Sequence, residues 1–383
     1  MKKFFMLRSE PHREIELDFV RTVAILLAVG WHFNHFYSAS ILGRVILYPG
    51  ASIGWAGVDL FFVLSGYLIG RIILREIRDK DTFDLKQFYV RRFFKLWPLL
   101  YISLLAMIAF SGVPLREFAP QIALHVQNYF PPLISSHLWS LAVEEHFYLI
   151  VAILLSALVR FRWSPRLVPL ACIAAIISAP ILRLLAYDAG FTPVQIQWQT
   201  QFRIDALATG ILLAWIYVYR ATYWVIAKRY RLGFALSAII GTLILISTQK
   251  NSFFGSTAGY TIAYLTAACF VLSVNEANLF SPSSKASRLV VGISMISYAM
   301  YIWHVPVAGL LERALPKLGI TEGDFLYVFL CYALSFAVAY LATVLVEQPF
   351  LQLRDRIFPR KSRAELRTLG KENITYEQQP KRL

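Results

Sequence analysis

Ten long apolar segments run through the chain, and each is close to the length of a helix that crosses a lipid bilayer. By hydropathy they extend over about residues 16–37, 54–71, 93–112, 140–159, 167–187, 203–219, 232–248, 257–274, 289–311 and 324–346. A membrane-spanning helix needs about 20 mainly apolar residues. Hydrophobic residues make up 57% of the 383 residues, and charged residues only 16%. The pattern predicts an all-α, polytopic integral membrane protein with about ten transmembrane helices.

Basic residues are distributed unevenly among the connections between these segments. Of the 38 Lys and Arg residues, 30 fall in the two tails and the even-numbered loops, 7 fall on the opposite side, and Arg21 lies inside the first segment. Because cytoplasmic loops carry an excess of Lys and Arg, both termini are predicted to be cytoplasmic. The net charge of +15 then marks a cytoplasmic face suited to anionic lipid or a phosphate-bearing ligand, and no nucleic-acid partner is expected.

The chain divides into one membrane domain and two short tails. We expect a cytoplasmic N-terminal tail at 1–15, a transmembrane domain at 16–350 and a charged cytoplasmic C-terminal tail at 351–383, with no cleavable signal and no second globular domain. The three cysteines have no metal-ligand spacing and are interpreted as small core residues, so no metal site is expected; they are Cys172, Cys269 and Cys331.

The first apolar segment carries Arg21 and His32 inside its apolar run, eleven positions apart. At about 100° per residue this spacing is three turns plus roughly 20°, so both side chains share one stripe, with a rise of about 16 Å between them. Ionisable groups within a membrane span usually face the bundle interior or a water-filled cavity. Alternatively, Arg21 extends to a lipid headgroup and His32 is a polar residue near the opposite interface.

A basic group comes just before the third segment, in FYVRRFFKLWPLLY, and contains Arg91, Arg92 and Lys95. Arg91 and Lys95 share a helix face. The group is either an interfacial anchor or a clamp for phosphates, for which Arg has the matching planar geometry.

The predicted topology sorts the polar residues of the spans into two layers. Arg21 and the group before the third segment lie near the cytoplasmic side, and the outer layer contains His32, Asp59, Glu144, Arg203, Asp205 and His304. An outer-layer base and carboxylate suit proton transfer. A structural salt bridge is the alternative for Arg203 and Asp205, and Glu347 is expected to pair structurally. The supporting polar network is expected to include Ser65, Tyr67, Trp139, Ser140 and Tyr298.

Seven motifs, in order, resemble those of the acyltransferase family 3 membrane proteins, which O-acylate carbohydrates and other hydroxyl acceptors. They are Arg21 with His32 after ten intervening residues, GVDLFFVLSGYLI, RRFFKLWPLLY, LWSLAVEEHFYL, FRIDALATG, SYAMYIWHVPV and VEQPF. The resemblance covers about Leu17 to Phe350. Lys95 stands where the family often has Arg, and His146 where it often has Gln.

The resemblance implies an O-acetyltransferase that takes an acyl group, usually acetyl, from acyl-CoA on the cytoplasmic side, with no permanently bound cofactor. Arg21, Arg91 and Arg92 are expected to hold the phosphates and leave the thioester near His32. We hypothesise that His32 is the general base, oriented or charged by Glu144, on a hydroxyl of a carbohydrate, glycolipid or other acceptor; an acyl-histidine intermediate is the alternative. The resemblance also implies a multi-pass location in the cell inner membrane.

Two other classes of protein are compatible with intramembrane charges. A translocator of a lipid-linked sugar or polysaccharide precursor would use them to line a path, although the sequence has no paired interrupted helices with inverted symmetry. A purely structural scaffold would leave the ionisable groups without a purpose. The longest outer connection, Pro114 to His137, is expected to contact the acceptor.

Overall fold

The computed structural model describes residues 13–33, 41–111, 116, 119–130, 135–321 and 324–358, and within these ranges it contains only helices, turns and loops. The all-α prediction is therefore confirmed for this part of the chain. The helices are α1 (Ile15–His32), α2 (Ile41–Ile53), α3 (Gly57–Lys80), α4 (Leu85–Ser111), α5 (Ala119–Ala123), α6 (Trp139–Arg160), α7 (Leu167–Asp188), α8 (Pro193–Trp198), α9 (Ile204–Tyr219), α10 (Ala221–Arg229), α11 (Arg231–Ile246), α12 (Tyr260–Val274), α13 (Lys285–Ala314), α14 (Phe325–Ala342) and α15 (Gln348–Ile357). Short 3-10 or π-helical turns precede or extend several of them: η1 (Gly54–Ala56), η3 (Ser136–Leu138), η4 (Thr200–Phe202), η5 (Gly255–Gly259), η6 (Leu315–Leu318) and η7 (Thr343–Glu347).

Seven helical segments of the described chain are long and apolar enough to cross a membrane, or eight if a bent helix pair is counted as one span. They coincide with seven of the ten predicted spans. The other three predicted spans correspond to α1, α9 and α11. Helix α1 has 18 residues but carries Glu16, Asp18 and Arg21, whereas α9 and α11 have 16 residues each.

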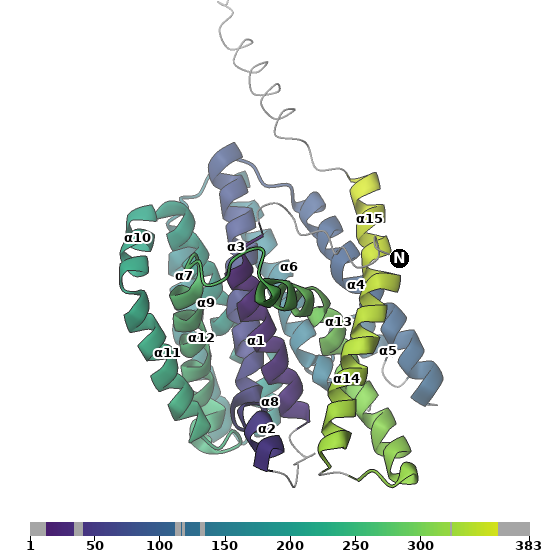
Figure 1. Ribbon diagram of the computed structural model, residues 1–383. Helices are drawn as coiled ribbons and strands as arrows, with labels where there is room; N and C mark the ends of the chain where they lie inside the picture. The colour runs from purple at the N-terminus through teal and green to yellow at the C-terminus, as the bar shows by residue number, and fades with distance from the viewer. Residues whose placement is uncertain are drawn as a thin grey trace, which may run out of the picture.

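Helices α1 and α3 run through the centre of the bundle, with α7, α9, α11 and α12 on one side and α4, α13 and α14 on the other (Figure 1). The start of α1 lies beside the second half of α3, where Arg71 donates two hydrogen bonds to Glu14. The two helices are therefore antiparallel. We call the ends of the bundle the Arg21 end and the His32 end.

Helices α3 and α9 pack more closely than any other pair, and they run parallel. Asp59 pairs with Arg203 at their starts, and Arg78 donates to the carbonyl of Val218 at their ends. A Cβ added at Gly66 would lie 2.2 Å from the backbone oxygen of Leu207, so only glycine allows this approach. Gly66 therefore serves the close packing of these two helices.

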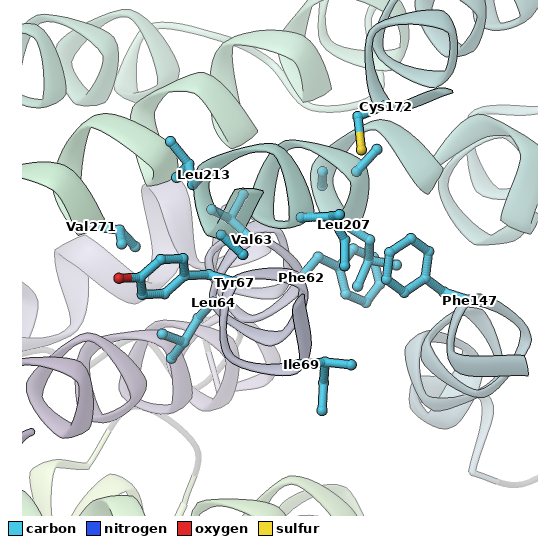
Figure 2. Packing of buried hydrophobic residues seen from close by; sticks show 14 of the residues in the cluster. Phe62, Val63, Leu64, Tyr67, Ile69, Phe147, Cys172, Leu207, Leu213 and Val271 are labelled. Carbon is cyan, nitrogen blue, oxygen red and sulfur yellow. The ribbon is translucent and has the colours of Figure 1, made fainter. Parts of the chain in front are cut away.

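The main core forms around α3. In Figure 2, Tyr67 extends towards Val271 of α12, while Phe62 lies close to Phe147 of α6. A second cluster joins α1 and α4 to α13 and α14. Because α1 contributes to both clusters, the stripe bearing Arg21 and His32 lies between two packed halves.

The surface and the interior have the polarity expected of a protein in lipid. On α7, Leu170 and Leu185 are more than 60% exposed, whereas Arg183 of the same helix is completely buried. Large exposed apolar side chains also cover α11 and α14. A soluble protein rarely exposes such continuous apolar surface, so these faces suit contact with lipid.

Some connections predicted as loops are helical. Helix α2 precedes the second predicted span, α10 turns by 109° from α9, and α15 makes residues 351–357 of the predicted tail helical. These segments are too short or too polar to register as spans. Most of the N-terminal tail, the C-terminal tail beyond 358 and parts of the connection from Pro114 to His137 lie outside the described residues.

Candidate active site

Arg21 and His32 of α1 both face the interior of the bundle. The Arg21 guanidinium donates 3.0 Å to the Ser294 hydroxyl of α13 and 3.1 Å to Asp18. His32 is half-buried and lies among aromatic rings of α13 and η3. Since α1 is a continuous helix between them, a rise of about 16 Å separates these two groups.

The Arg21 end holds a group of guanidinium side chains. Arg92 of α4 lies 4.7 Å from the ring centroid of Tyr148 on α6, and the charges of Arg92 and Arg13 both act on Arg21. The Asp18 carboxylate takes hydrogen bonds from Arg13, Arg21 and Ser294. Three converging guanidinium groups with one such carboxylate suit a multiply charged anion, since arginine binds phosphate oxygens in pairs.

Lys95 and Arg91 differ from Arg92 in their surroundings. Lys95 forms an ion pair with Glu347, which is 3% exposed. Its charge is thus matched by a structural partner, as expected for Glu347, whereas Arg92 of the same motif lies against Tyr148. Arg91 is half-buried on α4 and makes interactions of its own.

A polar stripe on α6 connects the two ends of the bundle. Ser140, Glu144 and Tyr148 are spaced four residues apart and share a face. The Tyr148 hydroxyl bonds with Ser65 of α3, and Ser140 bonds at 2.7 Å with the Tyr301 hydroxyl of α13. The stripe therefore extends about 12 Å from the guanidinium group towards His32.

Glu144 lies in the middle of this stripe. Its strongest interactions are with Arg92, Ser65, Glu145 and Tyr148. These partners lie towards the Arg21 end, and the role of Glu144 in orienting or charging His32 stays a prediction. Glu144 also exerts its charge on Tyr301, so its field reaches the next group.

Three imidazole rings meet at the His32 end. The ring centroids of His32 and His304 are 5.0 Å apart, those of His137 and His304 are 5.2 Å apart, and those of His32 and His137 are 6.1 Å apart. His137 and His304 are buried. In the described ranges, no group of three or more metal-binding side chains is arranged to hold a metal ion.

Backbone carbonyls determine the tautomers of His137 and His304. His304 Nδ1 lies 3.0 Å from the Met300 carbonyl, and His137 Nε2 lies 3.1 Å from that of Ile302. A carbonyl only accepts, so these nitrogens carry hydrogen and the other ring nitrogens are acceptors. The Ile302 carbonyl is available because Pro306, four residues on, has no N–H. Both rings thus present neutral acceptor nitrogens to the cluster.

A cavity of about 160 Å³ opens beside His32. Its lining includes His137, Tyr301, Trp139 and Lys250. Lys250 is on the loop after α11, and its ammonium group lies 5.0 Å from the ring centroid of Trp31. Burial, with the nearby charge of Arg203 adding to it, lowers the pKa of Lys250 to about 8. The cavity therefore offers an imidazole, hydroxyl groups and an ammonium that titrates close to neutral pH.

Asp59, Arg203 and Asp205 form a structural network at the His32 end. Arg203 donates 2.6 Å to Asp59, and Arg183 donates 2.7 Å to Asp205. The Arg203 guanidinium stacks 3.8 Å from the ring centroid of Tyr260. All four charged side chains are at most 1% exposed. The structural salt bridge is the alternative that the geometry favours here, with Arg183 as an additional member.

Two tyrosines of the predicted supporting network lie away from His32. The Tyr298 hydroxyl donates 2.8 Å to the Leu96 carbonyl of α4. Tyr67 accepts hydrogen bonds from Asn275 and Arg71 at the Arg21 end. By contrast, Ser65, Trp139, Ser140 and His304 lie along the stripe or around the cavity. We interpret Tyr298 and Tyr67 as helix-joining residues.

Sequence reasoning missed His137, Tyr301, Asp18 and Lys250 as members of the site. His137 stands directly before the LWSLAVEEHFYL motif, and the proline two residues after His304 indicates a free carbonyl on that helix. These two signals could have identified the histidine pair. Lys250 lies in a polar loop and has no such signal.

The fold and the site define a multi-helix membrane protein whose interior holds a guanidinium group at one end and a histidine cavity at the other. Residues 14–344 match the family described as "Acyltransferase domain", and the chain belongs to this acyltransferase family. No solved structure matches the chain significantly.

Curated relatives have related names. The chain is 25% identical to the "Peptidoglycan O-acetyltransferase OatA" of Listeria monocytogenes serovar 1/2a, over 87% of this chain and 55% of that protein. It is 26% identical to the "O-acetyltransferase OatA" of Staphylococcus aureus strain NCTC 8325, over 70% of this chain and 49% of that protein. It is 25% identical to the "Putative peptidoglycan O-acetyltransferase YrhL" of Bacillus subtilis strain 168, over 92% of this chain and 57% of that protein. The chain thus spans about half the length of the curated relatives it matches.

Proposed function

We propose that this protein is an O-acyltransferase that moves an acetyl group from acetyl-CoA, entering at the Arg21 end, to a carbohydrate hydroxyl at the His32 end. One observation carries the proposal. A polar route leads from Arg21 and Arg92, along Tyr148, Glu144 and then Ser140, to the His32 cavity. A pantetheine arm is of the same order of length as the rise of about 16 Å between Arg21 and His32.

In this proposal the guanidinium groups of Arg21 and Arg92, with Arg91 beside them, hold the donor phosphates. The thioester then lies at the cavity, and the small volume of about 160 Å³ favours acetyl over long acyl chains. His32 accepts the proton of the acceptor hydroxyl, whose oxygen attacks the thioester carbonyl as the thiolate of CoA leaves. A neutral imidazole is required, so activity falls as pH drops below the pKa of that ring.

The acceptor we propose is a glycan outside the cytoplasm. The names of the relatives point to peptidoglycan, and the Lys250 ammonium and the polar cavity lining suit sugar hydroxyls. Mass analysis of cell-surface glycans with and without the protein tests this assignment. A mass difference of one acetyl group is expected, and identical glycans would contradict it.

We also propose ten membrane crossings with both ends of the chain in the cytoplasm and the protein in the cell inner membrane. Support comes from the parallel course of α3 and α9 and from Lys250, which lies beside Trp31 at the His32 end after α11. Helices α1, α9 and α11 then cross the bundle with the seven longer segments, and the basic loops fall on one side.

The catalytic role of His32 is tested by transfer of label from radiolabelled acetyl-CoA. His32→Ala is expected to lower turnover about a hundredfold or more, since general-base catalysis contributes at least that factor. The matched control is His146→Ala, which removes an imidazole of α6 that bonds with Thr200 outside the proposed route. If His32→Ala turned over as fast as His146→Ala, His32 would have no part in the reaction.

A further inference from the structure

A second, larger cavity lies at the Arg21 end, on the side of the bundle formed by α3, α9 and α10. Its volume is about 600 Å³, and its lining includes Arg75, Arg78, Lys228, Trp224 and Glu276. It shares no lining residue with the His32 cavity. The proposed donor route uses none of these side chains.

One hydrogen-bonded network forms the wall of this cavity. Arg75 donates 2.9 Å to the Tyr217 hydroxyl, and Lys228 donates 2.8 Å to Glu276. The Tyr217 ring packs edge-on against Trp224, with centroids 5.0 Å apart. Trp224 is only 5% exposed. The wall therefore consists of side chains already held in place by α3, α9, α10 and the loop after α12.

The wall carries charges of both signs. Arg78 is paired with Asp79 on α3, and Lys228 of α10 is paired with Glu276. Arg75 is half-buried on α3, and within the described part of the chain it contacts a tyrosine hydroxyl and ring but no carboxylate. Across the cavity, Glu276 has a left-handed backbone, with φ of 53°, and Arg231 donates to its carbonyl. Burial acts to raise the pKa of Glu276, but the hydrogen bond and charge of Lys228, with hydrogen bonds from Trp224 and Tyr217, together lower it, so this carboxylate is ionised at neutral pH.

Helix α10, which borders the cavity, carries exposed apolar side chains that suit lipid. Helix α10 turns by 109° from α9, so it does not continue along the direction of that helix. Tyr223 and Val225 of α10 are 63% and 60% exposed, and Val225 also lines the cavity. Tyrosine beside aliphatic residues is typical of the membrane interface. A soluble nucleotide has no apolar group to contact these side chains, whereas the acyl chains of a lipid would pack against them.

We propose that this cavity binds the headgroup of a zwitterionic phospholipid, with the phosphate on Arg75 and Arg78 and the ammonium on Glu276. A carboxylate has about four acceptor positions, so Glu276 can accept from an ammonium group while it keeps Lys228. An anionic headgroup without an amine would satisfy the guanidinium groups but would place a hydroxyl, or nothing, against Glu276.

The test is native mass spectrometry of the full chain in detergent, titrated with dioleoyl phosphatidylethanolamine or dioleoyl phosphatidylglycerol. The wild type is expected to retain phosphatidylethanolamine about tenfold better than phosphatidylglycerol. Arg75→Gln should lose about tenfold in affinity for phosphatidylethanolamine, the order expected for a charge-assisted hydrogen bond. The matched control is Arg160→Gln, an exposed arginine outside the cavity lining, which should behave as wild type.

A second variant guards against a folding defect. Glu276→Gln removes the proposed partner of the ammonium group. Its retention of phosphatidylglycerol is expected to rise to that of phosphatidylethanolamine, and a misfolded protein would not show this gain. Equal retention of both lipids by the wild type, or equal losses in Arg75→Gln and Arg160→Gln, would overturn the proposal. Displacement of the lipid by equimolar O-phosphoethanolamine or AMP, which have no acyl chains, would also overturn it and indicate a site for soluble phosphates.

Discussion

At the scale of single residues, a chain of hydrogen bonds fixes the orientation of the side chains around the His32 cavity. Pro306 frees the Ile302 carbonyl, this carbonyl orients His137, and the His137 backbone carbonyl in turn accepts a hydrogen bond of 2.7 Å from Tyr301. Because the cluster is buried, each of these bonds replaces one to water, and losing a partner leaves an unsatisfied polar group. The imidazole rings are therefore held in fixed orientations before any ligand arrives.

The Lys250 ammonium is a second group of the cavity that titrates, and it does so above neutral pH. The pKa of Lys250 is about 8, below the usual value of 10.5, so its charge disappears as pH rises through about 8. We expect kcat/KM for the acceptor to decline on that alkaline side, because a charge-assisted donor to sugar hydroxyls is lost. In Lys250→Met this alkaline limb should be absent. An unchanged alkaline limb in Lys250→Met would show that another group titrates.

The same shift has a consequence for stability. Between pH 8 and 10.5 the unfolded chain keeps the Lys250 proton that the folded chain has released, so stability rises with pH in that window. Below pH 8 the folded state carries the buried charge as a penalty, which Lys250→Met removes. The variant should therefore be more thermostable than wild type at pH 7, although less active, as is common where function requires a destabilising group.

Glu144 is expected to act through Tyr148. Glu144→Gln and Tyr148→Phe each change one hydrogen-bonded group, so each should lower kcat/KM for the donor about tenfold, and the double variant should be little worse than either single one. The acid limb of the pH–rate profile should keep its position, since the side chains that act on Glu144, Arg92 and Tyr148 among them, lie towards the Arg21 end. A shift of that limb to lower pH in Glu144→Gln would restore a direct role on His32.

At the scale of elements, the approach of α3 to α9 determines where the buried charges lie. The two helices touch backbone to backbone at Gly66 and Gly210, which brings Asp59 and Arg203 within hydrogen-bond distance at their starts. A buried ion pair adds little stability over an apolar pair, but removing one partner costs about 3–5 kcal/mol. The close contact therefore has to be maintained along both helices.

Gly66→Ala is the variant that tests this packing. Its Cβ would lie 2.2 Å from the Leu207 carbonyl oxygen, and backbone cannot move aside as a side chain can. The free energy of unfolding should fall by about 1–3 kcal/mol, measured as a lower midpoint of thermal unfolding in detergent. The matched control is Gly309→Ala on α13, where nothing lies within 4 Å of the added Cβ; alanine should stabilise that helix by up to about 1 kcal/mol. Equal midpoints for the two variants would contradict close α3–α9 contact.

Local patterns predicted the elements better than they predicted partners. The spacing of Arg21 and His32 indicated one helix stripe because helix periodicity depends only on nearby residues. The choice of Asp59 for Arg203 and of Arg183 for Asp205 could not be predicted, since it depends on which helices meet. Helix α10 was missed because nine residues that end in two charges resemble a loop, and Lys250 was missed because its aromatic partner Trp31 comes from α1.

At the scale of the whole molecule, the placement of charged side chains follows from the cost of leaving a charge unpaired in lipid. Charged side chains inside the bundle are paired or face cavities, as in Asp59–Arg203 and Arg183–Asp205, while lipid-facing surfaces such as α7 are apolar. The two cavities lie at opposite ends, one beside His32 and one beside α10. A donor from one side and an acceptor from the other can meet only if the helices between them cross the membrane completely, so the number of crossings is a functional question.

The position of α10 decides between ten crossings and seven. Thr82, on the connection from α3 to α4, and Ala189, after α7, fall on opposite sides of the membrane in either case, so they serve as references. Thr222 on α10 falls on the side of Thr82 if α1, α9 and α11 cross, but on the side of Ala189 if only the seven longer segments do. All three residues are exposed.

The experiment places single cysteines at these positions in a chain whose own three cysteines are replaced by alanine, and labels intact and permeabilised cells with a membrane-impermeant maleimide. We expect Ala189→Cys to react in intact cells, and Thr82→Cys and Thr222→Cys to react only after permeabilisation. Reaction of Thr222→Cys in intact cells would place α10 outside and remove the route by which acetyl-CoA and acceptor are proposed to meet.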